Sequence, residues 1–166
     1  MATSIGIDIG SLTTKAVVLQ DDKIVAACEI RSSDEAEQSA RTILAEAGRQ
    51  CGLMLEGQPL VATGMGSKSV SFAKSKAITT CLARGIRRTH PSVHINIDIG
   101  AESCTIIKLN ERGKMIDWAG HDKCASGTGV FLQQMAKLMQ VSLEEMSSFS
   151  ARATDRADIS STCAVF

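Results

Sequence analysis

The stretch that decides the fold reads Ile-Gly-Ile-Asp-Ile-Gly-Ser-Leu-Thr-Thr-Lys at residues 5–15, and residues 95–103 nearly repeat it as Ile-Asn-Ile-Asp-Ile-Gly-Ala-Glu-Ser. The two copies are 90 residues apart (95 minus 5), and the alignment continues to place apolar residues over apolar residues. A single repeat at this distance is too long for a solenoid period and indicates a duplicated lobe. We therefore expect two lobes, residues 1–92 and residues 93–166.

Each copy contains three apolar segments of alternating pattern, joined by short polar turns, which is typical of a β-meander. A short strand is expected at residues 59–64. The expected helices are residues 36–47 after a capping box at Ser32–Glu35, residues 72–84 closed by Gly85, residues 129–139, and a last helix opened by a capping box at Ser142–Glu145. Strands that alternate with helices predict an α/β fold.

The charge composition excludes several classes of partner. Eighteen basic residues balance eighteen acidic ones in a chain of 166 residues, so neither a nucleic acid nor an anionic membrane is expected as a partner. No apolar run approaches the ~18 residues that a membrane span needs, and we expect a soluble, cytoplasmic protein. A cluster of basic residues late in the first lobe is expected to form a solvent-exposed helix face: Lys74, Lys76, Arg84, Arg87 and Arg88.

Six cysteines are spread along the chain without any Cys-x-x-Cys pair. No ligand-spaced quartet therefore exists within one chain, and a metal site would need ligands from outside it. Four of the six lie in apolar or helical patterns and are expected to be reduced thiols without a metal: Cys28, Cys51, Cys81 and Cys104.

The chemistry of the first repeat suits a metal-bound phosphate. Asp8 can orient Mg²⁺ or its waters, and Gly10 lets the backbone approach an anion closely. The residues after Gly10 can donate hydrogen bonds or a counter-charge to phosphate oxygens: Ser11, Thr13, Thr14 and Lys15. The first repeat is therefore predicted to be a phosphate-binding turn.

The second repeat offers the same groups from the other lobe, with Asp98, Gly100 and Ala101 in the corresponding places. Two such turns can bind one polyphosphate between them. Glu102 follows directly and can act as a general base toward water, although an added carboxylate can also repel a triphosphate. This paired pattern resembles the actin-like ATPase superfamily, which implies an α/β, ribonuclease H-like fold that binds ATP and Mg²⁺.

Two further motifs narrow the resemblance. Residues 121–132, His-Asp-Lys-Cys-Ala-Ser-Gly-Thr-Gly-Val-Phe-Leu, and residues 159–166, Ile-Ser-Ser-Thr-Cys-Ala-Val-Phe, resemble the activators of 2-hydroxyacyl-CoA dehydratases and the ATPase subunits of benzoyl-CoA reductase. The resemblance implies a 4Fe-4S cluster shared across a dimer, with Cys124 and Cys163 as the ligands from each protomer. It also implies ATP-driven electron transfer from a ferredoxin or flavodoxin to an iron-sulfur dehydratase or reductase component.

The chain departs from that family at several positions. The family's second phosphate motif usually reads Asp-Ile-Gly-Gly-Gln-Asp, where this chain has Ala101, Glu102 and Ser103, so nucleotide binding is the firmer expectation and hydrolysis the weaker one. These departures favour a heterodimeric reductase subunit over a homodimeric activator. The family also continues beyond the position of Phe166, so the second lobe is expected to be incomplete.

Two other functions on the same fold remain open. A small-molecule kinase would need a catalytic Asp between the lobes, for which Asp117 and Asp122 are available without a recognisable kinase motif. A nucleotide-binding protein that does not hydrolyse ATP would be compatible with the altered second turn. The sequence does not indicate which CoA thioester the partner enzyme would act on.

Overall fold

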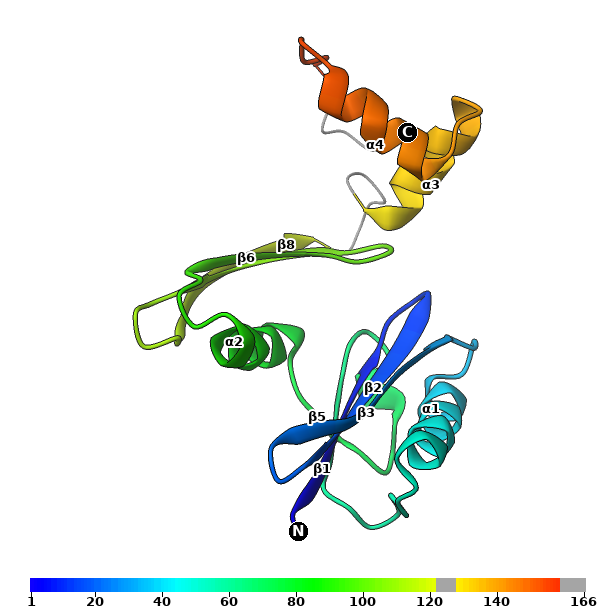
Figure 1. Ribbon diagram of the computed structural model, residues 1–166, viewed down its shortest axis with the longest axis vertical. Helices are drawn as coiled ribbons and strands as arrows, with labels where there is room; N and C mark the ends of the chain where they lie inside the picture. Colours follow the sequence, from blue (N-terminus) through cyan, green and yellow to red (C-terminus); the bar gives the residue numbers. More distant parts are fainter. Residues whose placement is uncertain (122–127, 159–166) are drawn as a thin grey trace.

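The computed structural model describes residues 1–121 and 128–158 of the chain, and Figure 1 shows two separate sheets with helices beside and beyond them. The strands are β1 (Thr3–Ile9), β2 (Thr13–Gln20), β3 (Lys23–Arg31), β4 (Leu60–Thr63), β5 (Lys74–Ser75), β6 (Ile95–Ile99), β7 (Cys104–Leu109) and β8 (Met115–His121). The helices are α1 (Ala36–Cys51), α2 (Ile78–Thr89), α3 (Gly129–Leu138) and α4 (Leu143–Arg152), with a short 3-10 turn at Ser67–Ser69. The α/β fold is confirmed.

The first sheet has the strand order β3-β2-β1-β4-β5. Its first three strands form the expected antiparallel meander, in which Asp8 of β1 lies opposite Lys15 of β2. The β2–β3 turn is tight because Asp21 and Asp22 both take positive φ angles, 46° and 66°. Strand β4 then pairs in parallel with β1, so the chain returns past α1 to the centre of the sheet.

The core of the first lobe lies between this sheet and α1. Ile5, Ile7 and Ile9 of β1 are only 4%, 2% and 2% exposed and belong to the same apolar cluster as the buried residues of α1. The helix buries mostly small side chains, among them Ala40 and Ala47, so its axis can lie close to the sheet. Because side chains alternate along a strand, Asp8 is directed to the other face of the sheet, away from α1.

The second sheet, β6-β7-β8, repeats the meander. Asp98 lies opposite Thr105 as Asp8 lies opposite Lys15, so the sequence repeat is also a structural repeat in the same register. Helix α2 packs on one face of this sheet, where Ala83 joins a small core with Ile107 and Leu109. In Figure 1, α2 lies on the side of the second sheet that faces the first sheet.

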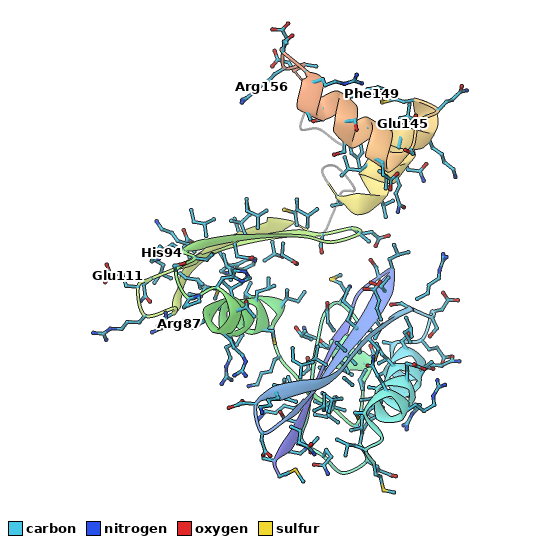
Figure 2. All side chains as sticks on the ribbon, in the orientation of Figure 1. Arg87, His94, Glu111, Glu145, Phe149 and Arg156 are labelled. Carbon is cyan, nitrogen blue, oxygen red and sulfur yellow. The ribbon has the colours of Figure 1, made fainter. Side chains whose placement is uncertain are left out.

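The opposite face of the second sheet is exposed in the described part of the chain. Ile95, Ile97 and Ile99 of β6 are 60%, 59% and 58% exposed, whereas the equivalent isoleucines of β1 are buried. Figure 2 shows side chains standing out from this face. The two repeats therefore form the same strands, but only the first has its isoleucine face covered by a helix.

One of the two expected capping boxes is wrong. The N-cap of α1 is Glu35, which makes no side-chain cap hydrogen bond. The hydroxyl of Ser32 instead donates to the backbone oxygen of Gly10, because a tertiary partner is available to it. The second box is confirmed: Ser142 and Glu145 at the start of α4 bond reciprocally.

The helix expected at residues 72–84 begins later and ends later, as α2 at Ile78–Thr89. Lys74 and Ser75 pair with β4 as the edge strand β5, and this pairing overrides their helical spacing. Gly85 lies inside α2 and does not close it. The five basic residues expected on one helix face are all exposed, but Lys74 and Lys76 precede α2, so the expectation of a single helix face is wrong for these two. Arg88 also donates to the backbone oxygen of Asp22 in the β2–β3 turn.

A charged network joins the first turn of α1 to the segment before β5. Glu37 accepts hydrogen bonds from Arg41 at 2.7 Å and from the hydroxyl of Ser71 at 2.8 Å, and Arg41 lies over the Phe72 ring. The hydrogen bonds from Arg41 and Ser71 lower the pKa of Glu37 from 4.5 to about 2. The network therefore stabilises the folded chain only while Glu37 is ionised.

In the described part of the chain, no helix is long and apolar enough to cross a membrane.

The unequal burial of the two repeats predicts unequal effects of the same substitution. Ile7→Ala removes methyl groups from a closed core and should lower the free energy of unfolding by about 2–5 kcal/mol. Ile97→Ala, at an exposed position, should change it by no more than about 0.5 kcal/mol. Urea denaturation of both variants measures the difference. Equal losses would mean that the face of β6 is buried in solution.

The lowered pKa of Glu37 predicts a pH-dependent contribution to stability. A carboxyl group whose folded pKa is depressed contributes stability that is complete above its unfolded pKa of 4.5 and is lost as the pH falls through about 2. Glu37→Gln should therefore be less stable than the wild type at pH 7, and the difference should shrink below pH 4.5. Urea midpoints across this pH range test the prediction, with Glu56→Gln, an exposed position, as the control. A difference that does not depend on pH would contradict it.

Candidate functional site: two facing turns

The two repeats end in turns that are closed in the same way. The N–H of Gly10 donates to the carbonyl oxygen of Thr13 at 3.0 Å, and the N–H of Gly100 donates to that of Ser103 at 2.8 Å. A Cβ at Gly10 would lie only 2.8 Å from the Thr13 oxygen, so the first turn requires glycine. The sequence repeat thus produces the same hydrogen-bonded backbone turn twice, once after the first strand of each sheet.

The hydroxyl groups of Ser32 and Thr14 stabilise the first turn from the side of the sheet that α1 covers. Ser32 donates its proton to the carbonyl oxygen of Gly10 at 2.8 Å and therefore accepts the bond from Thr14, also at 2.8 Å. Thr14 is fully buried, on the face that α1 covers. Its hydroxyl thus supports the turn from the core side. The expected partners Ser11 and Lys15 are exposed, and Thr13 is half-buried.

The second turn is supported by a helix. The N–H of Gly129, the first residue of α3, donates to the carbonyl oxygen of Gly100 at 3.0 Å, and Val130 donates to that of Ala101 at 2.9 Å. Residue Thr128, the N-cap of α3, is fully buried there. The glycine carbonyl that a serine holds in the first lobe is therefore held by the start of α3 in the second.

The carboxylates of the two repeats act on each other. Burial raises the pKa of Asp8 above its usual 3.8, Lys15 opposes the rise, and the charge of Asp98 adds to it. Lys15 also donates to the hydroxyl of Thr13 at 2.8 Å, so its ammonium group lies at the first turn. Two carboxylates from different sheets are well suited to share a divalent metal ion, and the ammonium group of Lys15 is suited to an anionic ligand beside it.

A third glycine turn, which the sequence analysis placed only after a short strand, belongs to the site. Gly64 has a φ of +88°, and a Cβ there would lie 2.5 Å from a carboxylate oxygen of Asp8. The N–H of Gly66 donates to the carbonyl oxygen of Ile9 at 3.0 Å. The signal was present as Thr-Gly-Met-Gly after the strand, but only the parallel pairing of β4 with β1 brings it to Asp8.

The remaining site residues are placed as follows. In the second turn, Ala101 is half-buried and Glu102 is exposed. Cys124 and Cys163 lie outside the described residues. The other four cysteines are free thiols, all half-buried, and within the described ranges no three His, Cys, Asp or Glu side chains gather as a metal site.

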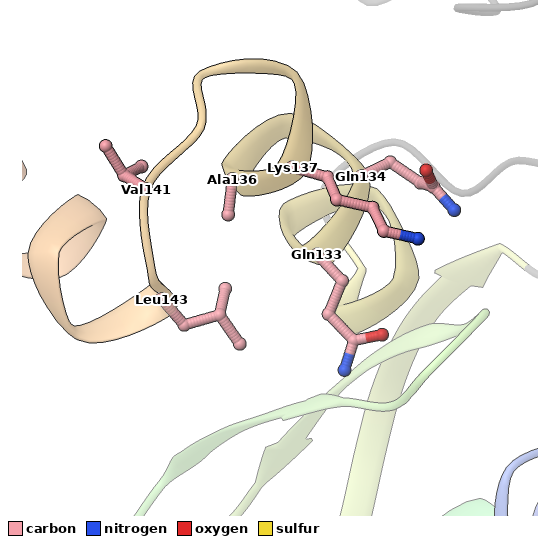
Figure 3. Close-up of a pocket in the computed structure, with 6 residues that line it drawn as sticks. All are labelled: Gln133, Gln134, Ala136, Lys137, Val141 and Leu143. Atoms are coloured by element: carbon pink, nitrogen blue, oxygen red, sulfur yellow. The ribbon is translucent and has the colours of Figure 1, made fainter.

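A hollow between α3 and α4 offers no comparable chemistry. Figure 3 shows its lining, to which α3 contributes Gln133, Gln134, Ala136 and Lys137, while Val141 and Leu143 complete it. The lining has one cationic group and no carboxylate, and it contains none of the residues of the two turns. We therefore place the candidate site at the facing turns.

Known proteins with similar sequences place the chain in an ATPase family. The model of the BadF/BadG/BcrA/BcrD ATPase family matches residues 5–166. The chain is 38% identical, over 165 residues, to the activator of lactoyl-CoA dehydratase from Anaerotignum propionicum, covering 98% of this chain and 64% of that relative. The chain thus spans less than two thirds of the length of this relative.

Two solved structures have the same fold. The activator of the 2-hydroxyisocaproyl-CoA dehydratase from Clostridium difficile, with bound ADPNP, matches with a TM-score of 0.83 at 35% identity, over 98% of this chain and 62% of that one. Component A of the (R)-2-hydroxyglutaryl-CoA dehydratase from Acidaminococcus fermentans matches with a TM-score of 0.84 at 34% identity, over 99% and 64%. The expected actin-like ATPase fold and the family resemblance are confirmed.

The raised pKa of Asp8 predicts that this carboxylate destabilises the ligand-free protein. A carboxyl group with a raised folded pKa imposes a penalty that is complete above that pKa and absent below its unfolded value of 3.8. Asp8→Asn should therefore melt at a higher temperature than the wild type at pH 7, and the advantage should vanish as the pH falls toward 3.8. Thermal unfolding followed by circular dichroism measures it. A lower melting temperature for Asp8→Asn at pH 7 would show that the carboxylate stabilises the fold.

Proposed function

Because the chain belongs to the BadF/BadG/BcrA/BcrD ATPase family, we propose that it binds Mg-ATP between its two glycine turns and uses ATP hydrolysis to drive electron transfer. The electron passes to a partner enzyme that dehydrates or reduces a CoA thioester. The observation that carries the proposal is the duplicated turn, closed by the same hydrogen bond in both lobes, with Asp8 and Asp98 near enough for their charges to interact.

Each group at the turns has a task in this proposal. Backbone N–H groups after Gly10 and Gly100, together with Ser11 and Thr13, donate to phosphate oxygens. Lys15 adds positive charge, as phosphoryl transfer requires at the phosphate oxygens. Thr14 keeps the first turn in place through Ser32, since its own hydroxyl is already bonded there.

The two aspartates hold the metal. Asp8 and Asp98 orient Mg²⁺ or its waters, and the bound ion neutralises phosphate charge and polarises the phosphorus–oxygen bond. Glu102, exposed at the second turn, accepts the proton of the water that attacks the γ-phosphorus, while the bond to the leaving ADP oxygen breaks. A divalent ion held by both carboxylates would also offset the burial of Asp8 and its repulsion from Asp98, which raise the pKa of Asp8 in that order of size.

The electron-transfer part of the proposal rests on Cys124 and Cys163. Four thiolates are needed for a 4Fe-4S cluster, and two from each of two protomers, identical or not, supply them around the axis of a dimer. When bound, the cluster supplies the one-electron carrier between a ferredoxin or flavodoxin and the iron-sulfur component of a dehydratase or reductase. The relatives named as activators of dehydratases support this class of partner.

One experiment tests both halves of the proposal with opposite expected results. In anaerobically prepared protein, Asp8→Ala should weaken the affinity for Mg-ADPNP by at least about tenfold, a loss of ~1.4 kcal/mol, because a metal ligand is removed. It should leave the iron content unchanged. Cys124→Ser and Cys163→Ser should lose iron and keep the nucleotide affinity.

Calorimetric titration with Mg-ADPNP and analysis of iron and sulfide give the two measurements. Glu56→Ala is the matched control, because it removes an exposed carboxylate shortly before β4, whose first residue Leu60 pairs with Ile5 and so lies toward the end of β1 away from Gly10. Iron retained in both cysteine variants would refute the cluster ligands, and unchanged nucleotide binding in Asp8→Ala would refute the site between the turns.

A further inference from the structure

Ser32 lies in the connection between β3 and α1, outside both copies of the Asp-Ile-Gly repeat, and its spacing predicted only a capping box that did not form. It makes two hydrogen bonds to the first turn instead. Its hydroxyl donates to the carbonyl oxygen of Gly10 at 2.8 Å, and its backbone N–H donates to that of Leu12 at 3.0 Å. One residue thus holds two carbonyl oxygens of a turn that precedes it by 22 positions at Gly10.

The two oxygens belong to the peptide units Gly10–Ser11 and Leu12–Thr13. A peptide unit is planar, so a bond that holds the Gly10 oxygen also directs the N–H of Ser11, which points the opposite way from the same plane. In the described part of the chain, the N–H groups of Ser11 and Leu12 donate to no protein acceptor. They are the free backbone donors of the first turn, and the side chain of Ser32 determines where the first of them points.

Thr14 fixes the direction in which the Ser32 hydroxyl donates. A serine hydroxyl has one proton, and the carbonyl oxygen of Gly10 can only accept, so the proton of Ser32 lies toward Gly10. Thr14 therefore donates its own proton to Ser32 at 2.8 Å. Because Thr14 is fully buried, solvent does not compete for this bond. The three groups form a chain of hydrogen bonds that runs from Thr14 through Ser32 to Gly10.

Resting on the proposed nucleotide site, we propose that Ser32 is a positioning residue for the phosphate contact of the first turn. Its hydroxyl holds the Gly10–Ser11 peptide plane so that the N–H of Ser11 is directed to the phosphate before the ligand binds. A donor that is oriented in advance avoids the free-energy cost of ordering the turn during binding. Without the hydroxyl, that cost falls on ligand binding.

Ser33 offers a matched control for this role. Its hydroxyl is also bonded within the connection between β3 and α1, donating to the Glu35 oxygen at 2.8 Å and contacting the Ser39 hydroxyl at 2.9 Å. Neither partner belongs to the first turn. Ser33→Ala therefore weakens the same connection without releasing Gly10. If Ser32 merely stabilised the connection, Ser32→Ala would lower the free energy of unfolding as Ser33→Ala does, and the folded protein would keep its ligand affinity.

The experiment titrates Mg-ADPNP into each folded variant by calorimetry. Ser32→Ala should weaken the affinity by about three- to tenfold, the range expected for one hydrogen bond. Ser32→Thr keeps the hydroxyl and should restore the affinity of the wild type. Ser33→Ala should bind as the wild type does.

The amide proton of Ser11 gives a spectroscopic readout of orientation. A hydrogen bond to a phosphate oxygen deshields the donated proton, so saturation with Mg-ADPNP should move this resonance downfield in the wild type and in Ser33→Ala. In Ser32→Ala the shift at saturation should be smaller, because the N–H is no longer held toward the ligand. General loosening of the fold would not act on this one resonance.

Ser32→Cys covers the case in which the alanine variant does not fold. Cysteine fills nearly the same space, but its S–H is a weak donor, so the bond to Gly10 is lost or weakened without a cavity. The affinity for Mg-ADPNP and the shift of the Ser11 proton should fall in the same direction as in Ser32→Ala.

The outcomes separate this inference from the proposed function. If the wild type does not bind Mg-ADPNP, the proposed function fails and the role of Ser32 fails with it. If the wild type binds, but the folded Ser32 variants without the hydroxyl bind equally well or keep the full shift of the Ser11 proton, the nucleotide site stands and the role of Ser32 is refuted. An equal loss of affinity in Ser33→Ala would refute it as well.

Discussion

A peptide unit cannot turn its N–H without turning its C=O, and this rigidity governs the site. In each lobe the carbonyl oxygen of the glycine that ends the Asp-Ile-Gly repeat is held by a hydrogen bond from elsewhere in the chain. The next N–H is thereby oriented before any ligand arrives. Preorganised donors of this kind can stabilise phosphate charge without a cost of reorganisation when the ligand binds. The proposed binding of phosphate near Asp8 and Asp98 depends on these two peptide units being held in place.

The groups around Asp8 lower the stability of the ligand-free chain. Asp8 is half-buried on the face of β1 that faces away from α1, where burial and the charge of Asp98 both disfavour its ionised form. Gly64 brings a backbone turn against the same carboxylate, in a conformation that other residues rarely adopt. Such features are typical of ligand-binding sites, because a bound cation can relieve the repulsion. The closed apolar core between the first sheet and α1 offsets this loss of stability.

Much of the fold could be predicted from the sequence because its strands are local and strongly patterned. The alternation of isoleucines around Asp8 and Asp98, and the polar turns that follow, specified both meanders and their equivalent register. The capping box at Ser142 was also recognisable, since its partners are three residues apart. The box expected at Ser32 did not form, and Lys74 and Ser75 became an edge strand, because partners distant in sequence competed successfully with the local ones.

The sequence by itself determined that two turns of the same kind exist and which residues they contain, because the spacing of Asp, Gly and hydroxyl residues is a property of adjacent positions. Only the tertiary structure decided that β6 leaves its isoleucines exposed while β1 buries them, and that Gly64 lies against Asp8. It alone also decided that α3 is attached to the second turn. These contacts join residues that are far apart along the chain, so no local pattern records them; they follow from which elements pack against which.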